Sequence, residues 1–141
     1  MVKRVFATAW FVCLSSILGP VALRAADVTG TVVSRMRAEA RACFAAAGWT
    51  VTDTAQFRAE SGAFQMAPVN GRMRGGGSTW QSVERGLPSV ETDYLNGEIV
   101  RLGRLHGVPT PVNAAIQLGM REITGRSRAP RTLDPADLLA A

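Results

Sequence analysis

Three groups of residues have side chains that could take part in chemistry. Ser78 and Thr79 follow a run of three glycines. Glu91 and Asp93 precede an apolar helical pattern, and His106 is the sole histidine. A hydroxyl group can both donate to and accept from a bound acid or alcohol, and a carboxylate in the first turn of a helix has a fixed direction. Ser78, Thr79, Glu91 and Asp93 are therefore candidates for binding a small polar ligand, although acidic residues are also what any helix N-terminus prefers. His106 is expected to be a cation at the C-terminal end of its helix.

Other kinds of site find little support in the residues. Cys13 and Cys43 are distant from each other and lie in apolar surroundings, so each is expected to be a buried thiol, and no zinc spacing can be assembled. The run Gly75–Gly77 lacks the preceding strand of a phosphate-binding loop. The net charge of +5 comes mostly from arginines placed singly along helical patterns. We therefore expect no metal, no cofactor held by this chain and no nucleic-acid partner.

The segments that must position the candidates have mostly helical patterns. With 141 residues, 47% hydrophobic and 19% charged, the chain suits one globular domain. Helical spacing of apolar residues predicts a helix over Thr31–Ala47, a weaker one over Thr52–Ala67 and a short one over Thr79–Arg85. No segment alternates with a period of two over a useful length. The sequence thus predicts an all-α fold, a single multi-helix domain.

The helix that carries Glu91 and Asp93 is expected to begin after a cap at Ser89 and to end before Gly107. Its predicted apolar stripe is Leu95, Ile99, Leu102 and Leu105. The next helix should open at Thr110 and Pro111, an N-cap followed by proline at the first helical position, and run to about Ile123.

The two ends of the chain are less regular. Residues 1–26 are either a buried apolar first helix or a secretory signal, and the lack of a small residue at the expected cleavage position favours the helix and a cytoplasmic location over export. The helical domain is expected over residues 27–125. Residues 126–141 are expected to be a flexible tail in which Asp134 and Pro135 can start a short helix.

Two motifs resemble those of the ketopantoate reductase (2-dehydropantoate 2-reductase) family. The segment Ser89–Gly97 (SVETDYLNG) resembles its Thr-Glu-Ile-Asp-x-Ile-Asn-Gly helix, and His106–Asn113 (HGVPTPVN) resembles its His-Gly-Val-Pro-Thr-Pro-x-Asn. In addition, Ser78–Gln81 is similar to the family's Ser-Met-x-Gln element and Met36–Gly48 to a helix ending in Ala-x-x-Gly. The likeness covers most of residues 31–123 and implies the C-terminal helical domain of such an enzyme, without the N-terminal Rossmann domain.

The resemblance implies NADPH-dependent reduction of a 2-oxo acid, ketopantoate, in pantothenate biosynthesis. The family's substrate-binding glutamate falls on Glu91 and its substrate-contacting serine on Ser78, or on Thr79 in a shifted alignment. The family's proton-donating lysine is absent, because Trp10 is followed by Phe11–Leu14, so no catalytic residue is identified. No Gly-x-Gly-x-x-Gly motif occurs either, and NADPH is implied only for a complete enzyme.

Three hypotheses follow. In the first, the chain is a truncated or split reductase that needs a separately encoded nucleotide-binding domain and is not active alone. In the second, it is a non-catalytic module that forms a homodimer or binds a small acid. The third hypothesis is an exported helical protein.

Overall fold

The computed structural model describes residues 4–6, 26–52, 82–83, 85–87, 90–129 and 132–141. In order along the chain, the elements are β1 (Arg4–Phe6), α2 (Ala26–Ala46), β2 (Thr50–Thr52), α5 (Thr92–His106), α6 (Pro111–Thr124) and α7 (Pro135–Ala140). The described residues are mostly helical, which confirms the predicted fold class.

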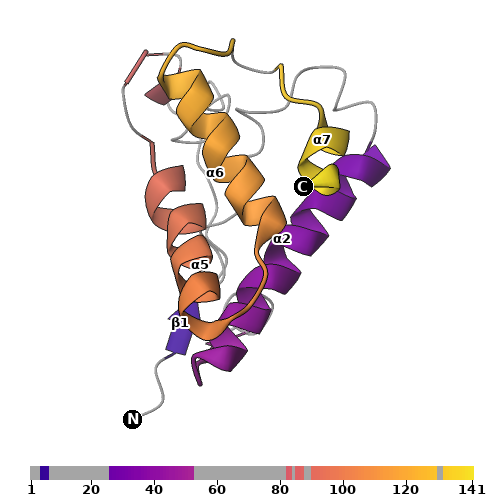
Figure 1. Cartoon of the computed structure of the whole chain (residues 1–141), viewed down its shortest axis with the longest axis vertical. Helices are drawn as coiled ribbons and strands as arrows, with labels where there is room; N and C mark the ends of the chain where they lie inside the picture. The colour runs from indigo at the N-terminus through magenta and orange to yellow at the C-terminus, as the bar shows by residue number, and fades with distance from the viewer. Residues whose placement is uncertain (1–3, 7–25, 53–81, 84, 88–89, 130–131) are drawn as a thin grey trace, which may run out of the picture.

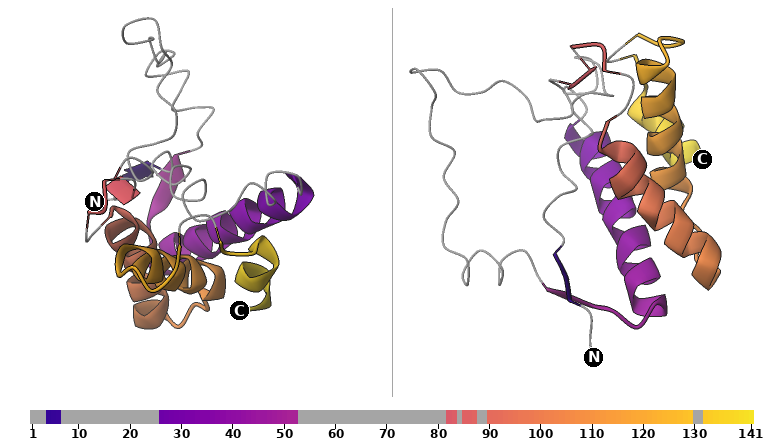
Figure 2. Two further views of the ribbon diagram at one scale, coloured as in Figure 1. Left: turned by 90° about the horizontal axis from the view of Figure 1, so that it is seen from above. Right: turned by 90° about the vertical axis from the view of Figure 1, so that its left-hand side faces the viewer.

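Helices α5 and α6 form an antiparallel hairpin against which the long helix α2 packs (Figure 1). The short helix α7 lies on the N-terminal half of α2 and also contacts α6. Figure 2 shows the two strands beside the C-terminal end of α2. The hairpin is thus held from one side by a single helix that contributes side chains along most of its length.

Two apolar clusters form the core. The larger one joins α2, α6 and the C-terminal residues through Val32, Met36, Val90, Val112, Ile116, Met120, Ile123, Leu133 and Leu138. The smaller one joins α2 to α5 through Ala40, Cys43, Phe44, Ile99 and Leu102. The Trp49 ring stacks on Phe44 at a centroid distance of 5.7 Å and covers the smaller cluster. Burial of these side chains supplies the main driving force for packing the helices.

Several helix ends agree with the sequence predictions. Gly107 ends α5 in the left-handed conformation (φ 68°), where a residue with a Cβ would be strained. Pro111 is the first residue of α6, where its missing N–H costs nothing. The Asp134 side chain accepts a hydrogen bond from the Ala136 amide (2.8 Å) and so caps α7. These three boundaries depend on local chemistry alone.

The strands correct two helix predictions. β1 and β2 pair in parallel, with Val5 opposite Val51, so residues 4–6 do not belong to a first helix and Thr52 does not begin one. Valine and threonine favour extended backbone, and pairing two distant segments satisfies their main-chain groups. The remainder of these two predicted helices, including Trp10, lies outside the described residues.

Helix α5 also differs from its prediction. It begins at Thr92 with Glu91 as the N-cap, not at a cap on Ser89. Its buried face contains Ile99 and Leu102 as expected, but Leu105 is 65% exposed. The face turned to the core instead includes small and polar residues, Thr92, Asn96 and Gly103. The predicted stripe of large apolar residues therefore wrongly included Leu105 and left out the small and polar residues of the buried face.

The C-terminal residues, expected to be a tail, pack on the domain. Leu133 and Leu138 are buried in the larger cluster.

Among the described residues no helix has the length and hydropathy that crossing a bilayer requires.

Candidate functional site

A buried polar network joins the three long helices. We call Glu39, Asn96 and Asn113 the Asn113 network. The Asn113 side chain is fully buried, and its Nδ2 donates to Glu39 Oε2 (2.6 Å) and to the Met36 carbonyl (3.1 Å). Its Oδ1 accepts from Asn96 Nδ2 (3.0 Å). Each of α2, α5 and α6 thus contributes one side chain to one hydrogen-bonded set.

Glu39 caps the start of α6 from another helix. The first amides of a helix have no partner inside it, and the Thr110 side chain makes no capping bond here. The amides of Val112 and Asn113 instead donate to the two Glu39 carboxylate oxygens, at 2.9 and 3.0 Å. A carboxylate at this position also interacts favourably with the helix dipole. Glu39 therefore fixes where α6 begins relative to α2.

The close approach of α5 to α6 depends on Gly97, the residue after Asn96. A Cβ built at Gly97 would lie 2.5 Å from Gln117 Nε2, at the end of a flexible side chain that would have to shift. Gln117 is one turn beyond Asn113 on α6, so glycine permits both the packing and the Asn96–Asn113 bond. The Asn113 network and Gly97 together set the position of α5.

Glu91 lies at the end of α5 that this arrangement positions. Its carbonyl accepts from the Leu95 amide (2.8 Å), so its backbone is held by the first helical turn. Its side chain is exposed and makes no capping hydrogen bond to α5. The Glu91 carboxylate is therefore solvent-accessible at the N-terminal end of α5.

Asp93 has a different role from Glu91. Its Oδ1 accepts from Arg121 Nε (2.7 Å) and from Gln117 Nε2 (3.2 Å), both on α6. The Arg121 side chain is 61% exposed, so the pair contributes modestly to stability. Asp93 ties the first turn of α5 to α6, next to Glu91.

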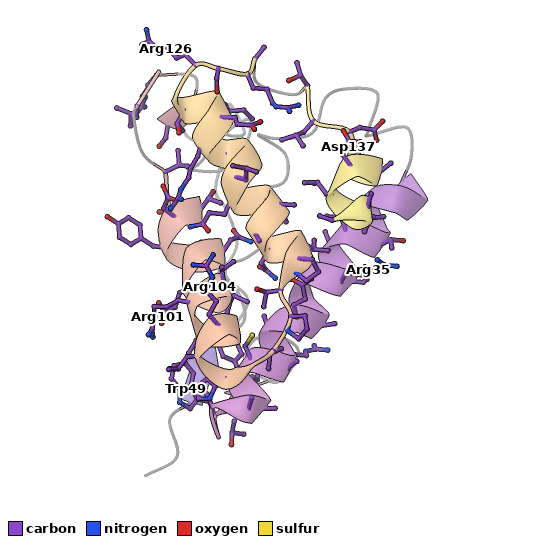
Figure 3. The ribbon with its side chains drawn as sticks, viewed as in Figure 1. Arg35, Trp49, Arg101, Arg104, Arg126 and Asp137 are labelled. Atoms are coloured by element: carbon purple, nitrogen blue, oxygen red, sulfur yellow. The ribbon has the colours of Figure 1, made fainter. Side chains whose placement is uncertain are left out.

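Of the three remaining candidate residues, the structure describes His106. Ser78 and Thr79 lie outside the described residues, so their distance from Glu91 stays a prediction. His106 is exposed in the last turn of α5, and Arg104 precedes it on the same helix (Figure 3). No group of metal-binding side chains occurs in the described part of the chain.

The Cys43 thiol is buried, as expected, and lies 3.7 Å from the Ile99 carbonyl. Burial, and secondarily the nearby Glu39 charge, raises the pKa of this thiol. A raised pKa keeps the sulfur protonated and unreactive near neutral pH. Cys43 is therefore a core residue and not a nucleophile.

Sequence reasoning missed Glu39 and Arg121. The signal for Glu39 is a carboxylate beside the apolar stripe of α2, one position before Ala40 and three after Met36, where a solvated charge is unexpected. Arg121 carries no comparable signal, because an arginine near the end of a helix is common.

The chain was compared with known proteins. Residues 6–123 match the model of the C-terminal domain of ketopantoate reductase PanE/ApbA. Among solved structures, the chain is similar to a PanE/ApbA family ketopantoate reductase from Ralstonia eutropha JMP134, with 30% sequence identity and a TM-score of 0.60. The similarity covers 82% of this chain and 37% of that enzyme. A comparison with curated proteins gives no match.

Proposed function

The chain belongs to the ketopantoate reductase family through the C-terminal domain of those enzymes, and from this premise we propose that it is the substrate-side domain of a reductase that converts 2-dehydropantoate to pantoate with NADPH. The observation that carries the proposal is Glu91, exposed at the N-cap of α5 where the family's motif has its substrate-binding glutamate. Its carboxylate would accept hydrogen bonds from the substrate's hydroxyl groups. Ser78 or Thr79 would contact the substrate as well.

The residues present do not fit the nicotinamide cofactor. A dinucleotide site needs a strand followed at once by a glycine-rich turn and a helix. The first glycine after β1 is Gly19 and the first after β2 is Gly62, so neither described strand leads into such a turn. The family's lysine is also missing after Trp10. We therefore propose that the domain works together with a nucleotide-binding domain that these residues do not supply, and that it is inactive without one.

Replacing Glu91 with glutamine tests the substrate role. The change keeps the shape but removes charge-assisted hydrogen bonds, which are worth about 1.5 to 3 kcal/mol each. Titrating pantoate into the chain combined with a family nucleotide-binding domain should show affinity reduced about tenfold or more. The melting temperature should change little, because Glu91 does not cap α5 with its side chain.

The matched control is Glu98→Gln, an exposed carboxylate further along α5 that pairs with Arg101. It should leave pantoate affinity unchanged. Equal affinities for the wild type and Glu91→Gln would remove Glu91 from the site. The chain without the nucleotide-binding domain provides the baseline, and it should not oxidise NADPH when ketopantoate is added.

A second candidate is a non-catalytic module that forms a homodimer. Tyr94 and Leu105 are 79% and 65% exposed. They are eleven residues apart, so their side chains are separated by only about 20° around the axis of α5 and lie on one face of the helix. On that face the two side chains flank the exposed Glu98–Arg101 pair, so a second copy of the chain would meet apolar contacts on either side of a polar centre. Sedimentation equilibrium should then show a dimer that the double change Tyr94→Lys, Leu105→Glu converts to monomer. A monomer at all concentrations would exclude this candidate.

A further inference from the structure

A pocket whose lining does not include Glu91 lies at the C-terminal end of α6. It has a volume of about 350 Å³, which lies at the lower end of the range for small-molecule sites. Apolar side chains of Val83, Leu87 and Ile123 form part of its lining, and polar and small residues complete it. The remaining lining residues are Gly86, Thr124, Arg126, Arg128 and Ala129.

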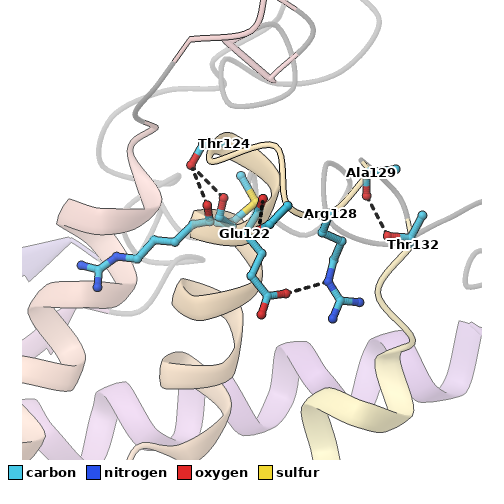
Figure 4. A network of polar contacts seen from close by, with 8 residues as sticks. Glu122, Thr124, Arg128, Ala129 and Thr132 are labelled. Atoms are coloured by element: carbon cyan, nitrogen blue, oxygen red, sulfur yellow. Dashed lines mark hydrogen bonds and ion pairs between the residues drawn. The ribbon is translucent and has the colours of Figure 1, made fainter.

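One of the two arginines is already neutralised. Arg128 Nε donates to Glu122 Oε2 at 2.6 Å, and Figure 4 shows the two side chains turned toward each other beside α6. No carboxylate of the described residues pairs with Arg126. A Cβ built at Gly86 would lie 3.4 Å from Arg126 Nη2, so this guanidinium group lies against another lining residue of the pocket. Among the described residues, Arg126 is therefore the positive charge of the pocket that has no carboxylate partner, and it lies beside an apolar surface.

The backbone of Arg126 is held in an uncommon conformation. Its φ is 62°, and it is the one non-glycine residue with a positive φ in the part of the chain that the structure describes. A helix usually ends with glycine in this left-handed position. Here Gly125 comes one residue earlier with an ordinary right-handed backbone, and arginine takes the left-handed position. Strained positions of this kind are concentrated at ligand sites.

We propose that this pocket binds a small organic monocarboxylate with a compact apolar body. The carboxylate pairs with Arg126, and the apolar body packs against Val83, Leu87 and Ile123. One unneutralised guanidinium group matches a single negative charge better than a doubly charged phosphate. Glu91 is not part of the lining, so the site is separate from the proposed substrate contact and does not depend on a nucleotide-binding domain.

The competing explanation is that Arg126 serves only as a cation at the negative end of the α6 dipole. That role needs no pocket and no ligand. It predicts that changes at Arg126 alter thermal stability alone. The proposal predicts that they alter ligand binding.

Isovalerate is a suitable probe, titrated into the full chain labelled with ¹⁵N and followed by amide chemical shifts. We expect saturable shifts at Val83, Leu87, Ile123 and Thr124, with an affinity in the millimolar range for so small a molecule. Isoamyl alcohol, which has the same branched body without the charge, should bind at least tenfold more weakly. Inorganic phosphate should not shift these amides in a saturable way.

Arg126→Gln should weaken isovalerate binding tenfold or more, and Arg104→Gln provides the matched loss of charge at the other end of the helical hairpin (Figure 3). Arg126→Gly is a second variant that suits the left-handed backbone, so it should fold at least as well while losing affinity to the same extent. The proposal is overturned if isovalerate does not saturate, if phosphate binds equally well, or if Arg104→Gln weakens binding as much as Arg126→Gln. A result for Glu91→Gln equal to wild type would support a site separate from the substrate contact.

Discussion

Replacing Asn113 with alanine should lower the free energy of unfolding by about 3 to 5 kcal/mol. The change removes the partner of Asn96 Nδ2, a donor to Glu39 Oε2 and the donor to the Met36 carbonyl, all in the interior. Leaving the buried Asn96 amide group without this partner costs about 1 to 3 kcal/mol, and losing the side-chain bond to the Glu39 carboxylate, whose Oε2 keeps the Asn113 backbone amide, costs about 1.5 to 3 kcal/mol. A domain of this size is typically stable by only about 5 to 15 kcal/mol, so urea denaturation followed by circular dichroism should show a large shift of the midpoint.

Gln117→Ala is the matched control for this experiment. Gln117 is one turn further along α6, also carries an amide, and makes one hydrogen bond, to Asp93, at a half-buried site. Its loss should cost about 1 kcal/mol or less. Asn96→Ala combined with Asn113→Ala should cost less than the sum of the two single changes, because both remove the same bond. If Asn113→Ala cost no more than Gln117→Ala, the Asn113 network would not hold the three helices together.

Replacing Gly103 with alanine should cost about 2 to 3 kcal/mol, through a steric clash. A Cβ at this position would lie 2.6 Å from the Val108 carbonyl oxygen and 2.7 Å from Thr110 Cγ2. The Val108 amide also donates to the Gly103 carbonyl (2.8 Å), so the chain passes directly over this residue as it turns from α5 into α6. Relieving the clash would move the start of α6 away from the Glu39 carboxylate.

Gly30→Ala provides the control of opposite sign. Gly30 is an exposed residue of α2, and a Cβ there would meet nothing within 4 Å. Alanine should therefore stabilise the helix by up to about 1 kcal/mol, since it loses less conformational entropy on folding. Thermal melts of the two variants should shift in opposite directions. A neutral or stabilising Gly103→Ala would mean that the 108–110 segment is free to move.

Much of the fold could be predicted because its signals are local. The apolar stripe of α2, with Val32, Met36, Ala40 and Cys43, is a helical repeat that is buried as expected. The end of α5 at Gly107 depends on backbone conformation, and the start of α7 depends on a side chain two residues from the amide that it caps. The family motifs are likewise continuous segments. For such features the residues that decide the structure are close together in the chain.

The remaining features depend on residues that are far apart in the sequence. Glu39 caps amides 73 and 74 positions away, and Val5 pairs with Val51. The exposure of Leu105 and the tight contact at Gly103 depend on how the chain turns back over α5. Periodicity can identify which face of a helix is apolar, but it cannot identify the polar partner that satisfies a helix end in the core. That choice was decided only by the tertiary structure, because a buried hydrogen bond forms wherever folding brings donor and acceptor together.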